Sequence, residues 1–271
     1  MQPAIIYEDE DIIVCKKPAG VATQTRRIGQ ADMESLLKNY RASKGELPYI
    51  GVVHRLDQPV EGIMVFAKNK EAAADLSRQI KTKLADKYYY AMTDGVPEKK
   101  KGTLEDELLQ NGKTNTSEVV ERGTPQAKHA SLSYEVVEQD GKHAVLRIKL
   151  DTGRHHQIRV QMAHAGLPLY GDVKYNTAWR QYVGNGASGC AADKMDVEAT
   201  GKTEVPDCGE AASKAERKIS GSRSVGRSEK MEPALCASRL EFVHPATGKR
   251  MMFETKPELE VFKDFCFKDE K

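Results

Sequence analysis

The pattern of apolar and polar positions divides the first third of the chain into short strands and amphipathic helices. Two apolar runs separated by acidic residues predict two strands within residues 5–16. A turn at Lys17-Pro18-Ala19-Gly20 follows them, because proline fixes φ and glycine tolerates positive φ. Apolar side chains at helical spacing predict helices over residues 31–43 and 70–85. Between these helices, the apolar run 63–67 predicts a buried strand.

The rest of the chain contains more strand patterns than helix patterns. Predicted strands cover residues 88–92, 130–138, 143–150, 237–243 and 251–255, and predicted helices cover residues 155–165 and 257–267. Strands interspersed with helices, several joined by hairpin-like turns, predict an α+β fold with a mixed, mainly antiparallel sheet and flanking helices.

Residues 180–234 depart from this pattern. Glycine, alanine, serine, lysine and glutamate dominate the segment, and large apolar residues are few. Such a segment buries too little surface to offset the entropy of ordering it. We interpret it as a disordered insertion within a single domain that spans residues 1–271. A short helix near residues 210–219 that orders on binding a partner is the alternative.

The composition excludes several classes of protein. The chain has no run of about 18 apolar residues, so it has no transmembrane helix, and it lacks a secretory signal. We therefore expect a cytoplasmic monomer whose five scattered cysteines are reduced thiols. The absence of a C-x-x-C pair argues against a zinc ribbon. A net charge of +2 neither requires nor excludes a nucleic-acid partner.

Two polar segments next to predicted elements are candidates for chemistry. His54-Arg55-Leu56-Asp57 precedes the buried strand, either as a reactive loop or as a surface Arg–Asp pair that closes a turn. Arg154, His155, His156, Gln157 and Arg159 begin a helix, where they suit a phosphate group or form an ordinary polar helix start. No acidic residue or cysteine completes a metal-ligand set near these histidines, so we expect no metal.

A tyrosine-rich strand is the third candidate. Alternation places Tyr89 on one face of the strand, and Tyr88 and Tyr90 on the other. A tyrosine ring here either belongs to the core or offers a stacking platform for a base.

Taken together, these segments resemble the RluA-type pseudouridine synthases. In chain order the resemblance rests on Lys16-Lys17-Pro18-Ala19-Gly20, His54-Arg55-Leu56-Asp57 with Gly62, Lys87-x-Tyr89-x-Ala91, Thr152-Gly153-Arg154-x-His156-Gln157-Ile158-Arg159, Gly171-Asp172-x-x-Tyr175 and Leu240-x-Phe242-x-His244-Pro245-x-Thr247-Gly248. These motifs cover nearly the whole chain except about 180–234. The resemblance implies the pseudouridine synthase catalytic fold, and because the pattern begins by Ile5 we expect no RNA-binding domain ahead of it.

Three positions depart from the family pattern. Val60-Glu61 stands where the family usually has Thr-Ser. His155 replaces a threonine or serine, and Cys236 replaces a common histidine. None of these positions is a catalytic group in the resemblance.

The resemblance also implies roles for individual residues. Asp57 would be the catalytic carboxylate, Arg154 would pair with it, and Tyr89 would lie against the uracil ring. Arg55 would enter the space that the flipped uridine leaves. We expect the remaining RNA contacts from His54, His156, Gln157 and Arg159. The reaction needs no cofactor.

The expected function is the isomerisation of specific uridines to pseudouridine in a stem-loop of rRNA or tRNA, with no membrane partner. Loops favour such chemistry, because an unpaired base costs least to flip. A nucleoside or glycoside hydrolase is an alternative, although glycoside hydrolysis usually needs a second carboxylate. A non-catalytic RNA-binding protein on the same fold is another.

Overall fold

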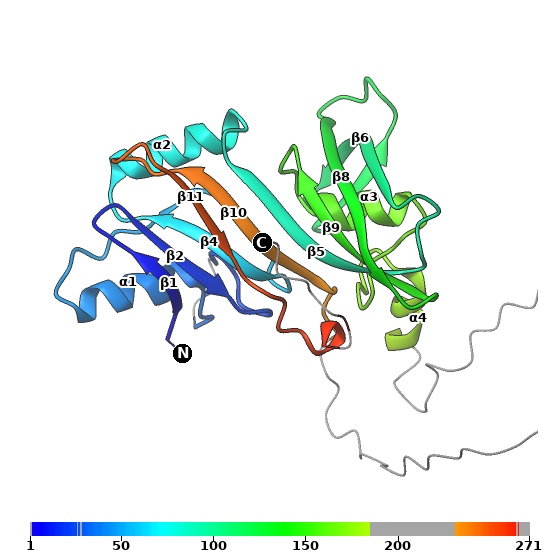
Figure 1. Cartoon of the computed structure of the whole chain (residues 1–271), viewed down its shortest axis with the longest axis horizontal. Coiled ribbons are helices and arrows are strands. Elements are labelled where there is room, and N and C mark those ends of the chain that lie inside the picture. The colour runs from blue at the N-terminus through cyan, green and yellow to red at the C-terminus, as the bar shows by residue number, and fades with distance from the viewer. Residues whose placement is uncertain (1, 26, 28, 185–230, 264, 266–271) are drawn as a thin grey trace, which may run out of the picture.

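The computed structural model of the chain describes residues 2–25, 27, 29–184, 231–263 and 265. The described strands form one sheet in the order β1-β2-β4-β10-β5-β9-β8-β6-β7, with β3 paired to β4 and β11 to β10 (Figure 1). The strands are β1 (Ala4–Glu8), β2 (Ile12–Lys17), β3 (Gly51–Val52), β4 (Glu61–Ala67), β5 (Asp86–Asp94), β6 (Lys101–Asn111), β7 (Thr116–Val120), β8 (Lys128–Gln139), β9 (His143–Leu150), β10 (Leu235–Val243) and β11 (Arg250–Glu254).

Few helices accompany this sheet. They are α1 (Met33–Ser43), α2 (Lys70–Lys81), α3 (Gln157–His164), α4 (Thr177–Gly184) and the short 3-10 helix η1 (Glu260–Phe262). In Figure 1 the long strand β5 crosses the middle of the molecule, between α1 and α2 at one end and α3 and α4 at the other. No helix in the described part of the chain is long and apolar enough to cross a membrane.

One parallel strand pair lies at the centre of the sheet. Among the described strand pairs, only β4 and β10 run parallel, with Gly62 opposite Ala237. Gly62 has a φ of +130°, and a Cβ built on it would collide with the backbone of Ala237. Only glycine permits both this backbone conformation and this close approach.

Alternating side chains on β2 and β4 supply two separate cores. Ile13, Cys15, Met64 and Phe66 pack with α1, and the same core extends to Ile158 and Met162 of α3. The intervening residues Ile12, Val14, Ile63 and Val65 pack with Ala72 and Leu76 of α2. Both faces of these strands are therefore buried, which explains their nearly continuous apolar sequences.

The predicted α+β fold with a mainly antiparallel sheet is confirmed, and each strand predicted from the sequence is present. Two predicted helices are shorter than expected. The helix predicted over 70–85 ends at Lys81, because Lys83 adopts a left-handed conformation and Leu84 turns toward solvent with 47% of its surface exposed. The helix predicted over 257–267 is only η1 in the described residues.

The sequence pattern missed four elements and misplaced the edges of the predicted insertion. Strands β3, β6 and β7 and helix α4 were not predicted. Within the segment 180–234, α4 continues to Gly184, and Ala234 is buried beside β5, where its carbonyl accepts a hydrogen bond from the Met92 amide at 3.0 Å. The central part of the predicted insertion, residues 185–230, lies outside the described residues, as does the alternative helix near 210–219.

A buried lysine ties the first turn to the loop that precedes β4. Lys17 is fully buried, and its ammonium donates hydrogen bonds to the carbonyls of Pro18 (3.0 Å), Val21 (2.6 Å) and Gln58 (3.0 Å). Burial lowers the pKa of Lys17 to about 8, although Glu232, Asp57 and Glu61 counteract the effect. The turn predicted at residues 17–20 therefore supports the loop that carries Asp57.

We expect Lys17→Met to destabilise the protein by about 3 kcal/mol or more, because it leaves three carbonyls without their charged donor. Methionine preserves the length and apolar volume of the stem. Urea unfolding of the variant measures the effect. Lys38→Met is the matched control: its surface pair with Glu34 is expected to contribute about 0.5 kcal/mol or less. Equal stabilities of the two variants would contradict the anchoring role of Lys17.

Candidate active site

Asp57 lies in a loop that hydrogen bonds hold on both sides. Thr23 accepts a hydrogen bond from the Leu56 amide at 3.2 Å and donates one to the Leu56 carbonyl at 3.0 Å. Within the loop, the Val60 amide donates to the Asp57 carbonyl at 3.0 Å. The Asp57 side chain keeps 25% of its surface exposed. The loop thus presents a carboxylate to solvent from a fixed backbone.

Arg159 connects Asp57 to a second, fully buried carboxylate. Its Nε and Nη2 donate to the two oxygens of Asp172, each at 2.7 Å, and its Nη1 donates to Oδ2 of Asp57 at 3.3 Å. The amides of Lys174 and Tyr175 also donate to Asp172. Burial alone would lower the pKa of Arg159, but Asp172 and Asp57 outweigh it and raise this pKa. Asp172 therefore fixes the plane of the guanidinium that faces Asp57.

This geometry corrects the expectation that Arg154 pairs with Asp57. Arg154 is exposed, and its Nε donates to the His129 carbonyl at 2.8 Å. Helix α3 begins only at Gln157, so Arg154 lies before its first turn. Arg159 lies in the first turn of α3 and His156 is the residue before the helix, in a left-handed conformation, and both side chains approach Asp57. The geometry also replaces the RNA contact expected of Arg159 with an ion pair inside the site.

His156 is the second residue that approaches the Asp57 carboxylate. Its Nε2 lies 3.5 Å from Oδ2 of Asp57, and its Nδ1 lies 2.7 Å from the hydroxyl of Tyr175. The Ser117 amide donates to that hydroxyl at 2.8 Å. We assign the ring proton to Nε2, because Nε2 faces the Asp57 carboxylate, which can only accept. Burial, followed by Arg159, lowers the pKa of His156 to about 2. A neutral imidazole therefore presents its N–H to Asp57.

The sequence analysis missed two residues of this arrangement, Asp172 and Tyr175. Tyr175 lies below Arg159, with the guanidinium 5.2 Å from its ring centre, and meets His156 edge to face. Both residues belong to the motif Gly171-Asp172-x-x-Tyr175, so the signal was present. Its spacing alone did not indicate which basic residue the aspartate would meet.

Tyr89 lies in the core next to this site. It is 7% exposed and packs with the apolar residues that surround the Asp57 loop and α3. Burial, followed by the charge of Asp57, raises the pKa of Tyr89. The phenol is therefore un-ionised at neutral pH and can donate a proton in a hydrogen bond, but it is a poor base.

Two residues expected to contact RNA are occupied by the protein itself. His54 accepts a hydrogen bond from the Val65 amide at 3.1 Å, and burial lowers the pKa of His54 to about 3. Gln157 is buried and bonds to Ser131, Thr152 and the Arg154 amide. Both side chains therefore stabilise the fold around the site, and their contact with RNA stays a prediction.

Arg55 makes no hydrogen bond or ion pair with the described residues and can meet a ligand. It is exposed, and it lines a cleft of about 280 Å³ together with Gln24, Arg27, Gln30 and Gln58. The cleft opens beside the Asp57 loop. A planar guanidinium in this position can stack on a base or bind a phosphate.

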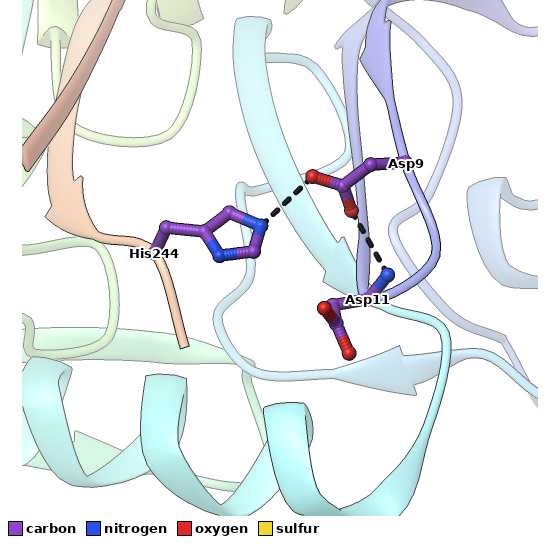
Figure 2. Close-up of side chains that lie close together, drawn as sticks. All are labelled: Asp9, Asp11 and His244. Atoms are coloured by element: carbon purple, nitrogen blue, oxygen red, sulfur yellow. Dashed lines mark hydrogen bonds and ion pairs between the residues drawn. The ribbon is translucent and has the colours of Figure 1, made fainter. Parts of the chain in front are cut away.

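A separate polar cluster joins the two ends of the described chain. Figure 2 shows Asp9 and Asp11 beside His244. The Nε2 of His244 donates to Asp9 at 2.8 Å, and its Nδ1 accepts the amides of Ala246 and Thr247. Asp9 also accepts the Tyr7 hydroxyl and two backbone amides. These bonds occupy the Asp9 and His244 lone pairs that a metal would need, so we assign the cluster to joining the β10–β11 turn to the β1–β2 hairpin.

The known proteins to which this chain is similar belong to one family. A model of the RNA pseudouridylate synthase family matches residues 11–164. The chain is 38% identical over 174 residues to the ribosomal large subunit pseudouridine synthase D of Vibrio cholerae, covering 63% of this chain and 52% of that protein. It is 32% identical over 254 residues to the protein of the same name from Pseudomonas aeruginosa, covering 93% of this chain and 67% of that protein.

A further relative and a solved structure are also similar to this chain. The Bacillus subtilis protein named uncharacterized RNA pseudouridine synthase YhcT is 34% identical over 174 residues, which is 63% of this chain and 57% of that protein. The matches to the Vibrio and Bacillus proteins span only about half the length of these relatives. The solved structure of human RNA pseudouridylate synthase domain containing 4 covers 95% of this chain and 90% of its own, with a TM-score of 0.65 at 19% identity. That likeness supports the fold alone.

The lowered pKa values of His54 and His156 predict a loss of stability in acid. Their pKa values fall from 6.5 to about 3 for His54 and about 2 for His156. Below pH 6.5 the unfolded chain therefore binds protons that the folded chain excludes, and stability falls as the pH decreases. Between pH 8 and pH 5 each histidine should account for a loss of about 2 kcal/mol, measured by urea unfolding at both pH values.

His54→Gln should remove one of these contributions, because its amide oxygen can accept the Val65 hydrogen bond without titrating. His129→Gln is the control, since that imidazole is 53% exposed and is expected to leave the acid loss unchanged. An equal acid loss in the wild type and in His54→Gln would contradict the assignment of a neutral, buried His54.

Proposed function

The chain belongs to the RNA pseudouridylate synthase family, and we propose that it isomerises particular uridines in RNA to pseudouridine. The reaction detaches uracil from C1′ of the ribose, rotates the base and rejoins it through C5. It needs a reactive carboxylate and a site that retains the freed base. The observation that carries the proposal is the Asp57 carboxylate, which Arg159 and His156 hold on one oxygen.

The two donors leave the other oxygen of Asp57 available. Arg159 and His156 both approach Oδ2, and Oδ1 has no hydrogen-bond partner within the described residues. We therefore assign the reacting lone pair to Oδ1, whether the carboxylate attacks C1′, attacks C6 or removes a sugar proton. Because Asp172 holds Arg159, the carboxylate does not need to reorganise its surroundings during the reaction.

Tyr89 supplies a second part of the proposed site. Its ring lies on the face of β5 that packs toward the Asp57 loop and α3. Since the phenol stays protonated, we propose that Tyr89 packs against the uracil ring and donates a hydrogen bond, and that it does not remove the C5 proton as a phenolate. Proton exchange at C5 then depends on another base or on water.

RNA must deliver its uridine out of a stack to reach Asp57. Flipping a base costs a few kcal/mol, and less where the base is unpaired. Arg55 lies two residues before Asp57 and lines the neighbouring cleft. We propose that its guanidinium enters the stack in place of the flipped uridine, as the resemblance implied.

Large-subunit ribosomal RNA is the substrate class that we propose first, with tRNA as the alternative. The support is that the relatives from Vibrio cholerae and Pseudomonas aeruginosa are both named as pseudouridine synthases of the ribosomal large subunit. Sequencing of pseudouridines in the RNA of a strain that lacks the gene would identify the modified position. Loss of a pseudouridine from tRNA alone would overturn the ribosomal assignment.

A hydrolase is less well supported, although the site does contain a second carboxylate. Asp172 is fully buried, and Arg159 and two backbone amides occupy its oxygens. It is therefore not available as a general acid for glycoside hydrolysis. Incubation with RNA that carries tritium at C5 of uridine separates the possibilities. A synthase releases tritium to water, a hydrolase releases free uracil, and a binding protein releases neither.

We expect Asp57→Asn to abolish tritium release, because asparagine keeps the size of the side chain but removes its negative charge. RNA binding, measured by filter retention, should change by less than about threefold, since no phosphate contact is lost. The stability of the variant should stay close to that of the wild type. Tritium release above a few per cent of the wild-type rate would exclude Asp57 as the reactive carboxylate.

The pairing of Arg159 with Asp57 is tested by replacing each of the two candidate arginines with methionine in turn. Arg159→Met leaves Asp172 as a buried, unpaired carboxylate, so we expect a loss of about 3–5 kcal/mol in stability and a nearly complete loss of turnover. Arg154→Met should change stability by about 0.5 kcal/mol or less, because that side chain is exposed. Thermal unfolding and tritium release measure both variants. A larger loss of stability in Arg154→Met would restore Arg154 as the partner.

A further inference from the structure

One lysine beside the proposed active site has no hydrogen-bond or ion-pair partner among the described residues. Lys87 and Tyr89 lie on the same face of β5, since side chains alternate along a strand. Their cross-strand neighbours on β9, Leu150 and Ile148, pack in the same core as Tyr89. Lys87 therefore lies one step along the strand from Tyr89, about 7 Å away.

The ammonium of Lys87 is half-buried and unpaired. Within the part of the chain that the structure describes, it makes no hydrogen bond and no ion pair. Burial lowers the pKa of Lys87, and its charge also lowers the pKa of the buried His54. Three other cations near the site are bound: Arg159 to Asp172, Lys17 to three carbonyls and Lys174 to the Asn115 carbonyl. Arg55 faces the neighbouring cleft instead. A partly buried charge without a partner is costly, so an anion from outside the protein is its natural complement.

Gly153 keeps the approach to this ammonium open. A Cβ built on Gly153 would lie 2.9 Å from Nζ of Lys87. Gly153 is exposed, and its φ lies outside the range that only glycine adopts readily. Backbone strain therefore does not explain this glycine, whereas access from the surface to Lys87 does. The ammonium ends at the surface beside the loop that leads into α3.

We propose that Lys87 binds a backbone phosphate of the RNA next to the flipped uridine, and that Gly153 leaves the space through which the phosphate reaches it. The inference rests on the proposed function and adds a positioning residue to it. A phosphate held beside Tyr89 fixes the ribose of the same nucleotide relative to Asp57. Lysine binds such a group as a point charge, without the directional demands of arginine.

The test measures RNA binding separately from turnover. Unmodified large-subunit rRNA transcript is bound to the wild type and to Lys87→Met at several KCl concentrations. Methionine retains the apolar stem of the side chain and removes the charge. We expect Lys87→Met to weaken binding about tenfold at 0.1 M KCl and to reduce the slope of log affinity against log salt by about 0.7–0.9, the value for one lost phosphate contact.

Lys149→Met is the matched control. Lys149 lies on the neighbouring strand opposite Tyr88, on the other face of the sheet, where it pairs with Asp86. Its salt slope should equal that of the wild type. Lys87→Arg keeps the charge and should keep most of the affinity for RNA. This variant still tests the role of the charge if Lys87→Met folds poorly.

Gly153→Ala is a second, independent test of the proposal. The added methyl group displaces only the flexible end of the Lys87 side chain. It should weaken binding in the wild type and have no further effect in Lys87→Met. An unchanged salt slope in Lys87→Met, or fully multiplicative effects of the two substitutions, would overturn the proposal. Tritium release by the wild type tests the proposed function separately: normal release together with an unchanged salt slope rejects only the role of Lys87.

Discussion

The buried pairing of Arg159 with Asp172 is the interaction on which the site depends. Two charged groups removed from water are stable only when their hydrogen bonds are satisfied, and here two bonds of 2.7 Å and two backbone amides satisfy them. The remaining nitrogen of the guanidinium is then aimed at Asp57. The pair joins α3 to the segment that follows it and sets the position of the carboxylate proposed to react. A change at Asp172 would therefore affect chemistry that it does not touch.

Much of the fold followed from the sequence, because several elements have a strong apolar period. The continuous apolar run of β4 and the helical spacing of α1 are of this kind, and both are present. Strands β6 and β7 were not predictable in this way. Residues 101–111 contain several acidic side chains and leucines at irregular spacing, and pairing with β8 on one side and β7 on the other makes them a strand. Tertiary pairing commonly overrides local preference in strands.

The sequence indicated which types of residue form the candidate site, but not which arginine pairs with Asp57. The motif that leads into α3 contains Arg154 and Arg159, and either spacing is compatible with a contact to Asp57. Which arginine meets Asp57 depends on where the helix begins. The sequence pattern predicted a start at residue 155, two residues before the observed start at Gln157. The same error assigned Gln157 to the surface, although it is buried. Boundaries of elements are set by local backbone conformation and hydrogen bonds that a periodic pattern does not contain. Here they are the left-handed conformation of His156 and the bonds of Gln157 to Thr152 and the Arg154 amide.

Two departures from the family pattern prove to be neighbours. Cys236 lies directly opposite Glu61 in the parallel pairing of β4 and β10. Glu61 is buried, and its carboxylate accepts the amides of Glu258 and Leu259 at 2.8 and 3.2 Å.

A small thiol at position 236 leaves room for the longer carboxylate, and burial, followed by Glu61, raises the pKa of Cys236 well above its usual range. Where the family pattern usually has a serine and a histidine, this chain has a carboxylate and a neutral thiol. The carboxylate of Glu61 fastens the segment after β11 to β4, the strand that follows the Asp57 loop. Glu61 holds this segment through the backbone amides of residues 258 and 259. The side chains of the segment can therefore vary without loss of the attachment. The residue that must stay small is the one at position 236, because a larger side chain there would displace the Glu61 carboxylate from the two amides.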